Sequence, residues 1–259
     1  MNEDVSVAKP NTTAYYQKQE ENHWKSLQAL IHNQNLTLSD ILINFPAFIR
    51  RRDLPRLLAD YELFKQIMHM PGSIIELGVY LGAGLFTWSK LLETFLPGDR
   101  SRKVYGFDSG RGYEKLSPED GSPEPWIKNV TGQKKANTEF VQAMVALHNQ
   151  DNLIPGVERC RLIPGDIRET VPEFVKKSQG IRLSLLYFDL NLYEPTLIGL
   201  RYLYPLVMPG GIIAFNGYGA PPWQGESVAI ERFFEEINLK QPVLKKFPFS
   251  IHPSGYFIK

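Results

Sequence analysis

Apolar side chains in the first 70 residues follow the period of an amphipathic helix. They recur at steps of three and four residues at Leu27, Leu30 and Ile31, and again at Leu38, Ile41 and Leu42. Pro46 and Pro55 interrupt this pattern, because proline cannot donate the hydrogen bond that a helix interior needs. The pattern therefore predicts several short helices over residues 1–70 rather than one long helix.

From Ser73 onward, short apolar runs alternate with helical stretches. The predicted strands cover 73–77, 103–108, 159–166, 183–189 and 212–216, with two closing strands over 243–247 and 254–259. The predicted helices cover about 85–95, 136–148, 195–204 and 226–238, and another follows Glu169. The run 183–189 is almost continuously apolar, as expected of a central parallel strand that is buried on both faces. This alternation predicts an α/β fold with a doubly wound, Rossmann-like sheet over 71–259, preceded by a helical segment over 1–70.

Composition narrows the class of protein without indicating its chemistry. Hydrophobic residues make up 43% of the 259 residues and charged residues 22%, which is typical of a globular chain. The 29 basic and 28 acidic residues nearly cancel, so there is no electrostatic reason to expect a nucleic-acid or membrane partner. The single cysteine, Cys160, excludes an internal disulfide and a cysteine-built zinc site. No apolar run approaches the roughly 20 residues that span a bilayer, and the first ten residues do not resemble a signal peptide, so we expect a cytoplasmic protein.

A glycine-rich loop follows the first predicted strand, with the pattern E-x-G-x-x-x-G-x-G over residues 76–84. Glycines let a ligand approach the backbone closely, and the next helix aims its N-terminus at the same place. Asp108 ends the second strand, where a carboxylate can accept hydrogen bonds from both ribose hydroxyls. Asp166 ends the third strand, beside the expected adenine position, although it can equally be a helix N-cap. Acids at three successive strand ends favour a nucleoside with a cationic tail over a pyrophosphate.

That ligand matches S-adenosylmethionine, and the chain from about residue 73 resembles the class I methyltransferases that use it. The resemblance rests on the glycine loop, the acids after strands two and three, and the sequence MPGG at 208–211. More narrowly, FDLNLYEPT at 188–196 and FNGYG at 215–219 resemble the macrocin O-methyltransferase (TylF-like) family. That family methylates sugar hydroxyls of antibiotics and related natural products with the help of magnesium. The resemblance implies a small-molecule acceptor, and helices before the first strand that shape the acceptor pocket or form a homo-oligomer.

The resemblance also implies roles for particular residues. The cofactor would contact Glu76, Gly78, Gly82, Gly84, Asp108, Ser109, Asp166 and Ile167. The acceptor pocket would involve Asn191, Tyr193, Asn216, Tyr218 and Trp223. Packing is the alternative role for Tyr193, Tyr218 and Trp223, because aromatic rings near a pocket also fill cores and surface loops.

The chain departs from the family at the metal site. The family places one acid at the end of strand four and two adjacent acids after strand five, because Mg²⁺ prefers carboxylate oxygens. Here Asp189 remains, whereas Asn216 and Gly217 occupy the paired positions and Asn191 replaces the acid that would serve as general base. We therefore predict weak or absent magnesium binding and assign no metal ligand.

The catalytic candidates are Asp189, His252 and Glu194. We expect Asp189 to lie near the reacting groups, while His252 is either a base or a surface histidine, and Glu194 either a base or a helix cap. An amine acceptor needs no base, so an N-methyltransferase stays open, as does a degenerate member that binds the cofactor without transferring a methyl group. A nicotinamide-dependent oxidoreductase is disfavoured, since its Tyr-x-x-x-Lys spacing occurs only at Tyr61 and Lys65, upstream of the glycines.

Two further features of the sequence indicate less specific roles. The basic cluster Arg50, Arg51, Arg52 and Arg56 suits ion pairs with Asp53, Asp60 and Glu62, with a clamp for an anionic group as the alternative. The polar segment 109–135, with Tyr113 and Trp126, is too long for a simple connection, and we expect it to form a lid over the cofactor.

Overall fold

The computed structural model describes residues 12–113, 115–127 and 136–259, and the chain forms two compact units, Met1–Leu54 and Pro55–Lys259. The described part of the first unit is helical, with α1 (Thr12–Asn33), α2 (Leu38–Ile43) and α3 (Phe45–Phe48). Thr37 begins α2 with a reciprocal cap, in which its side chain accepts from the Asp40 N–H and the Asp40 carboxylate accepts from the Thr37 N–H. Pro46 lies in the first turn of α3, where proline is tolerated, whereas α1 is longer than the sequence pattern predicted, at 22 residues.

The second unit begins earlier than the predicted domain boundary at residue 70. Its first helix, α4 (Leu54–Ile67), buries Leu63, Phe64 and Ile67 completely. These side chains belong to the same hydrophobic cluster as Ile74 of the first strand. Because α4 packs into this core, the boundary falls at Leu54 and Pro55 rather than after the helix.

A six-stranded sheet organises the second unit, in the order β3-β2-β1-β4-β5-β6. Its strands are β1 (Ser73–Leu77), β2 (Val104–Asp108), β3 (Cys160–Pro164), β4 (Leu183–Phe188), β5 (Val207–Phe215) and β6 (Gly255–Ile258). The pairs among β1 to β5 are parallel and β6 is antiparallel, so the predicted Rossmann-like α/β class is confirmed. The predicted strand over 243–247 is wrong, since only a bridge between Lys245 and Tyr256 forms there.

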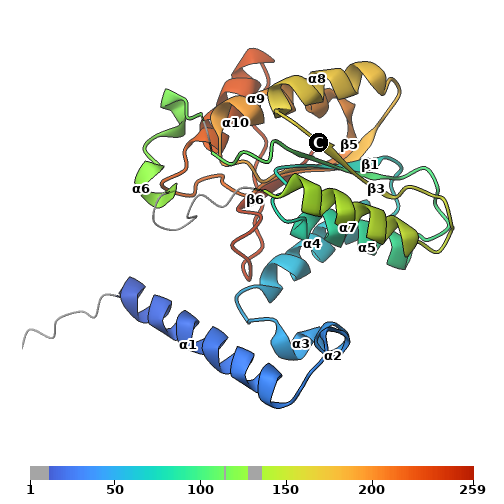
Figure 1. The fold of residues 1–259 in the computed structure, drawn as a ribbon. Helices are drawn as coiled ribbons and strands as arrows, with labels where there is room; N and C mark the ends of the chain where they lie inside the picture. Colours follow the sequence, from blue (N-terminus) through green and yellow to red (C-terminus); the bar gives the residue numbers. More distant parts are fainter. Residues whose placement is uncertain (1–11, 114, 128–135) are drawn as a thin grey trace, which may run out of the picture. The chain divides into compact units, whose positions relative to one another are not determined.

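Helices cover both faces of the sheet (Figure 1). One face carries α8 (Ile167–Lys177), α9 (Tyr193–Leu203) and α10 (Gly225–Glu236), and the other carries α4, α5 (Ala83–Phe95) and α7 (Thr138–Gln150). Three short helices lie in connections: η1 (Pro118–Asp120), α6 (Glu124–Trp126) and η3 (Tyr204–Leu206). Since β4 is buried at every position between these layers, its apolar sequence follows directly from its place in the sheet.

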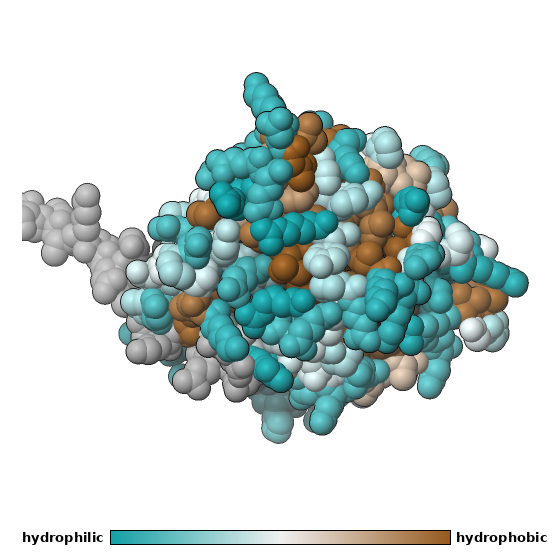
Figure 2. Space-filling model, turned by 90° about the horizontal axis from the view of Figure 1, so that it is seen from above, coloured by the Kyte–Doolittle hydropathy of each residue, from teal (hydrophilic) through white to brown (hydrophobic). Residues whose placement is uncertain are grey.

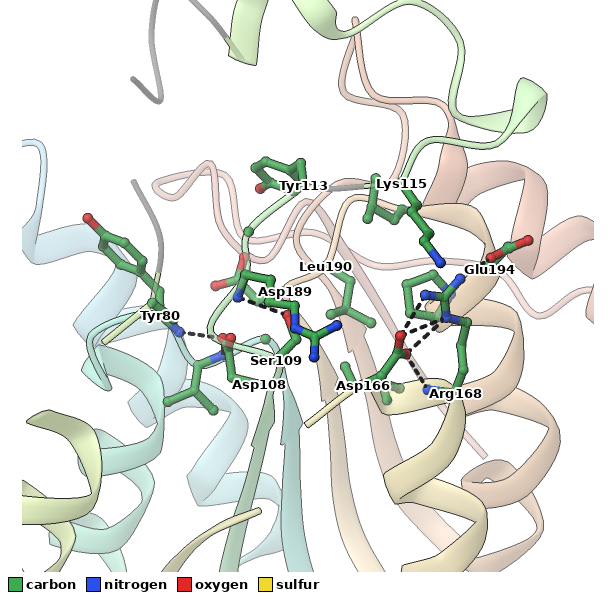
Figure 3. A pocket seen from close by; sticks show the side chains of 18 of the residues that line it. Tyr80, Asp108, Ser109, Tyr113, Lys115, Asp166, Arg168, Asp189, Leu190 and Glu194 are labelled. Carbon is green, nitrogen blue, oxygen red and sulfur yellow. Dashed lines mark hydrogen bonds and ion pairs between the residues drawn. The ribbon is translucent and has the colours of Figure 1, made fainter. Parts of the chain in front are cut away.

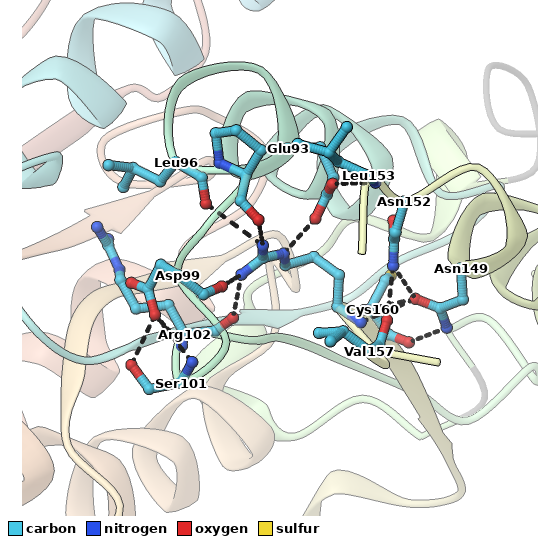
Figure 4. Close-up of polar contacts among 12 residues, drawn as sticks. Glu93, Leu96, Asp99, Ser101, Arg102, Asn149, Asn152, Leu153, Val157 and Cys160 are labelled. Atoms are coloured by element: carbon cyan, nitrogen blue, oxygen red, sulfur yellow. Dashed lines mark hydrogen bonds and ion pairs between the residues drawn. The ribbon is translucent and has the colours of Figure 1, made fainter. Parts of the chain in front are cut away.

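A buried arginine, Arg159, secures the edge of the sheet at which the parallel strands begin, and Figure 4 labels its partners Glu93, Leu96, Asp99 and Arg102. Arg159 precedes β3, is 1% exposed, and donates to a Glu93 carboxylate oxygen at 2.5 Å. The same guanidinium reaches backbone carbonyls of Leu96, Pro97, Asp99 and Arg102. Its N–H donors are therefore well satisfied. The guanidinium fastens the loop before β2 to the start of β3, at the edge of the sheet opposite the carboxyl ends of the parallel strands.

The surface shows no large uniform apolar area in the view of Figure 2, where hydrophilic residues predominate and hydrophobic ones form small groups between them. None of the helices in the described part of the chain is long and apolar enough to cross a membrane.

Candidate active site

A cavity of about 530 Å³ lies at the carboxyl ends of the parallel strands. Its walls come from the loop after β1, the segments after β2 and β3, and the segment from β4 into α9 (Figure 3). The strand order reverses between β1 and β4, and ligands of open α/β sheets bind at this reversal. The size of the cavity is that of a site for a small molecule or cofactor.

Asp108 fastens the glycine loop from the neighbouring strand. One carboxylate oxygen accepts from the backbone N–H groups of Val79 and Tyr80, at 2.8 and 2.9 Å, and the other accepts from the Gly110 N–H at 2.8 Å. Gly78 has a φ of +89°, and a β-carbon there would overlap the backbone of Asp189. The loop therefore requires glycine at this position for both conformation and space. Asp108, Ser109, Gly78 and Gly84, all predicted to bind the cofactor, line the cavity together with Tyr80, which the sequence analysis missed.

Glu76 lies buried at the end of β1, with 1% of its surface exposed. Its Oε2 atom has no hydrogen-bond partner among the described residues. Burial raises the pKa of Glu76 well above its usual range, and the nearby Arg56 offsets this only in part. Gly82, in the same loop, has a φ of +93° and is closely covered by the Phe86 ring. The end of β1 thus holds a carboxylate that a cationic group of a ligand would neutralise.

Asp166 is the N-cap of α8, the alternative that the sequence left open. Its side chain accepts from the Arg168 N–H at 2.9 Å, and both its oxygens contact the Arg168 guanidinium. Arg168 also donates to Glu194 at 2.6 Å, so a single guanidinium joins the two carboxylates (Figure 3). These bonds lower the pKa of Asp166. Asp166, Ile167, Arg168 and Glu194 all line the cavity, but the two acids enter it as partners of an arginine.

Asp189 follows β4 and is held by Arg56 from α4. The Nη2 atom of Arg56 lies 2.9 Å from Oδ2 of Asp189 and 3.8 Å from Oε1 of Glu76. Both Arg56 and Asp189 line the cavity, and the neighbouring acids raise the pKa of Arg56. Within the basic cluster, Arg50 and Arg52 instead pair with Glu20. The predicted ion pair of the cluster with Asp53 is confirmed by Arg52, at 3.5 Å, whereas Glu20 and Asp189 were not among the predicted partners.

The long segment after β2 is attached to the sheet by Asp120. This residue is 1% exposed, and its carboxylate accepts from the backbone N–H groups of Tyr193 and Ser117, each at 2.6 Å. The Tyr113 ring packs against Trp223 with centroids 4.7 Å apart, and Trp223 is 6% exposed, which fits the packing role for the tryptophan. Residues 128–135 and the side chain of Trp126, included in the predicted lid, lie outside the described residues.

A family model decides the relationship of the chain to known proteins. The model of the macrocin O-methyltransferase (TylF) family matches residues 51–247. The chain belongs to this family.

Individual relatives agree with the TylF assignment. The chain is 25% identical over 152 residues to mycinamicin III 3''-O-methyltransferase of Micromonospora griseorubida, which covers 59% of this chain and 57% of the relative. It is 25% identical over 151 residues, 58% of this chain and 54% of the relative, to 8-demethyl-8-(2,3-dimethoxy-alpha-L-rhamnosyl)-tetracenomycin-C 4'-O-methyltransferase of Streptomyces olivaceus. The matches thus span little more than half the length of these curated relatives. The crystal structure of CalS11, a calicheamicin methyltransferase, superposes with a TM-score of 0.79 at 27% identity over 93% of this chain and 92% of that one.

Asn216 and Gly217 occupy the positions at which the TylF family carries paired acids, and both make contacts with other residues. Asn216 is 3% exposed, and its Oδ1 accepts from the Tyr187 hydroxyl at 2.7 Å. A β-carbon at Gly217 would overlap the amide oxygen of Asn191, and the Gly217 N–H donates to Glu226 at 2.6 Å. No group of three or more histidine, cysteine, aspartate or glutamate side chains among the described residues could hold a metal ion. The donor set therefore does not fit Mg²⁺.

Glu226 holds the ends of β4 and β5, a role that the sequence analysis missed. The fully buried carboxylate accepts from the backbone N–H groups of Leu190, Asn191 and Gly217. Asn191, with a φ of +61°, then donates from its amide to the Tyr113 hydroxyl at 3.0 Å. Asn191 thus lies beside a cavity residue, whereas Asn216 is engaged in the core.

Of the remaining candidates, His252 lies at the same strand edge but not in the cavity wall. Its ring contacts the backbone of Asn216, and packing around it lowers its pKa, with Asp189 opposing and Arg56 reinforcing that shift. Tyr193 and Tyr218 pack against the hydrophobic core, and the Tyr218 hydroxyl accepts from Gln241 at 3.3 Å. The packing role considered for these two tyrosines accounts for their described contacts.

Proposed function

We propose that this TylF-family protein transfers a methyl group from S-adenosylmethionine to a hydroxyl of a sugar, carried by a natural product or its nucleotide precursor. The observation that carries the proposal is the cavity at the β1–β4 reversal, with the buried carboxylate of Glu76 beneath its glycine loop. Family membership and the 0.79 TM-score to a calicheamicin methyltransferase support it.

The residues of the cavity suit the separate parts of this cofactor, which supplies a methyl group on an already activated sulfonium. Glu76 and the backbone of Gly78 and Gly84 would hold the cationic methionine end. Asp108 and Ser109 would hold the ribose, since the Asp108 oxygen that accepts from the Gly110 N–H can accept a further hydrogen bond, whereas the other oxygen already accepts from two backbone N–H groups. Ile167 and the backbone of Asp166 would border the adenine. Fixing the cofactor beside the acceptor contributes directly to rate, because methyl transfer is an in-line displacement that depends on alignment.

The acceptor class follows from the relatives. Two matched enzymes are named for methylating sugar hydroxyls of mycinamicin and a rhamnosyl tetracenomycin, and CalS11 is described as a TDP-rhamnose 3'-O-methyltransferase. We infer a deoxysugar hydroxyl as the acceptor here. The apolar face of Tyr113, which lines the cavity and is backed by Trp223, suits a sugar ring.

A hydroxyl acceptor needs a base, and we propose His252. This residue lies outside the cavity wall, but it interacts electrostatically with Asp189 and Arg56, which line the cavity, so an acceptor held beside Asp189 would lie near its ring. Its lowered pKa keeps the imidazole neutral at physiological pH, as a base requires. Glu194 is bound by Arg168 and Asp189 by Arg56, so each of these carboxylates already has a cation as its partner. Asp189 would instead lie beside the reacting groups, with Asn191 and Tyr113 bordering the acceptor.

The test combines cofactor binding with product formation. Purified protein is incubated with S-adenosylmethionine and TDP-rhamnose, a rhamnosylated aromatic polyketide or a matching aminosugar, and products are read by mass spectrometry. A hydroxyl-methylated product, lost in His252→Asn, is the expected result, whereas methylation of the amine alone would support an N-methyltransferase. S-adenosylhomocysteine should raise the melting temperature. Absence of that shift would refute the assignment of S-adenosylmethionine as the cofactor. A shift without any product would favour a degenerate family member that binds the cofactor but transfers no methyl group. The homo-oligomer and the cytoplasmic location stay predictions.

A further inference from the structure

An arginine lies where the family would place a cation. Arg56 lies in the first turn of α4 and reaches the ends of β1 and β4, the two strands that flank the cavity. Its side chain is 29% exposed, and it lines the cavity together with Asp189. The guanidinium is therefore anchored on the sheet side and open on the ligand side.

Three carboxyl groups surround this single guanidinium. Asp189 is bonded to it at 2.9 Å, Glu76 lies at 3.8 Å, and Asp60, four residues along α4, interacts with it electrostatically. Glu76 and Asp60 are each 1% exposed, so water does little to stabilise their negative charge. Among the described contacts, the positive charge of Arg56 opposes the effect of burial on both carboxyl groups. This arrangement fixes Arg56 strongly, since moving it would leave buried acids without a cation.

The surrounding contacts exclude a second cation at this place. The Asn216 oxygen is engaged by Tyr187, and the space beside Gly217 is filled by the Asn191 amide. A divalent ion would have to displace Arg56 and would then find only the Asp189 carboxylate in the cavity wall at the family's three metal positions. The loss of the paired acids and the presence of Arg56 thus have the same consequence: both disfavour a divalent ion beside Asp189.

We propose that Arg56 is the permanent cation of this active site and performs the electrostatic role that a divalent metal would otherwise have. This assignment deepens the proposed methyl transfer and rests on it. The guanidinium holds Asp189 and donates an N–H hydrogen bond to the acceptor oxygen. As the oxygen bonds to the methyl carbon, the carbon–sulfur bond breaks with its electron pair on sulfur, and the hydroxyl proton passes to His252. Arg56 exchanges no proton, and it stabilises the negative charge that develops on the oxygen.

The first test needs no acceptor. Mn²⁺ binding is measured by electron paramagnetic resonance for the wild type, Arg56→Met, Arg56→Lys and the control Arg52→Met, whose arginine belongs to the same basic cluster but pairs with Glu20. Wild type, Arg56→Lys and Arg52→Met should show no one-to-one Mn²⁺ site, whereas Arg56→Met should gain a measurable one-to-one site, because Asp189 and Glu76 lose their cation. A tight site in the wild type, or no gain in folded Arg56→Met, would overturn the assignment.

The second test uses the methylation assay. Arg56→Met should lower kcat by about 100-fold or more, the usual cost of losing a charge-stabilising donor, with the KM for S-adenosylmethionine changed less than about threefold. Arg56→Lys should retain an intermediate kcat, and EDTA or added Mg²⁺ should leave the wild-type rate unchanged. Loss of activity in EDTA with recovery in Mg²⁺ would contradict the proposal.

The two tests separate this inference from the proposed function. If the wild type methylates no acceptor, the proposed function fails, and the Mn²⁺ titrations still decide whether Arg56 excludes a metal. If Arg56→Met does not fold, judged by its thermal unfolding, the wild-type response to Mn²⁺ and EDTA and the kcat of Arg56→Lys decide instead.

Discussion

Gly84 lies directly against the carboxylate of Glu76, and a β-carbon at Gly84 would come within 3.0 Å of both carboxylate oxygens. Gly84 is in the first turn of α5 and does not have a positive φ, so space and not conformation requires glycine here. The loop glycine and the buried acid therefore form one unit: the absent side chain makes room for the carboxylate.

Replacing Gly84 by alanine should displace the Glu76 carboxylate and weaken cofactor binding. We expect the affinity for S-adenosylhomocysteine, measured by calorimetry, to fall at least about tenfold, the equivalent of 1.4 kcal/mol. The fold should persist, because alanine is favoured over glycine in a helix by up to about 1 kcal/mol. Gly98→Ala is the control, since a β-carbon there meets nothing within 4 Å. Wild-type affinity in Gly84→Ala would show that Glu76 does not contact the cofactor.

Asp166→Ala distinguishes a cap from a cofactor ligand. Loss of the N-cap of α8 should destabilise the protein by about 1 kcal/mol in urea unfolding. The affinity for S-adenosylhomocysteine should fall less than about threefold, because the carboxylate is already engaged by Arg168 while the backbone of Asp166 and Ile167 remains. Asp108→Ala serves as the comparison and should reduce binding far more, since it also releases the glycine loop. Equal losses in the two variants would assign Asp166 to the adenine.

The fold was largely predictable because its signals are local. The apolar runs and helical periods mark the strands and helices, and the strand-end positions of Glu76, Asp108, Asp166 and Asp189 follow from them. Parallel strands bring such residues to one edge of a sheet whatever the details of packing, so the place of the site could be inferred from their order in the chain.

The partners within the site could not be predicted in the same way. The contact between Arg56 and Asp189 joins residues 133 positions apart, and nothing in the local sequence distinguishes Arg56 from Arg52. Asp120 and Glu226 act on backbone N–H groups, which carry no sequence signature. The second compact unit begins at Pro55 and not at residue 71 for a related reason, because only tertiary packing shows that α4 belongs to the core.

Glu226 should contribute strongly to stability. Its buried carboxylate accepts three backbone hydrogen bonds from the segments after β4 and β5, so Glu226→Ala leaves buried donors unsatisfied. We expect a loss of about 2–4 kcal/mol in the free energy of unfolding, measured in urea. Glu235→Ala, on the same helix with its side chain 72% exposed, should change stability by less than about 0.5 kcal/mol. A similar small loss in both variants would contradict the anchoring role.

Asp60 should make the stability depend on pH. Burial raises its pKa from 3.8 to about 7, with Arg56 opposing and Asp189 adding to the shift, and its Oδ1 has no hydrogen-bond partner among the described residues. Between these values the folded state binds the proton more tightly than the unfolded state, so this contribution to stability declines as the pH rises from about 4 through 7.

At about 1.4 kcal/mol for each pKa unit, the ionised carboxylate of Asp60 costs the folded state up to about 4 kcal/mol at pH 8. Asp60→Asn should therefore melt at a higher temperature than the wild type at pH 8, and this difference in stability should shrink by more than half at pH 5, where the folded state keeps Asp60 protonated. The control Asp151→Asn removes a carboxylate that is 74% exposed and has a lowered pKa, so its difference from the wild type should stay constant over this range. The same constancy in Asp60→Asn would show that Asp60 does not titrate in this interval.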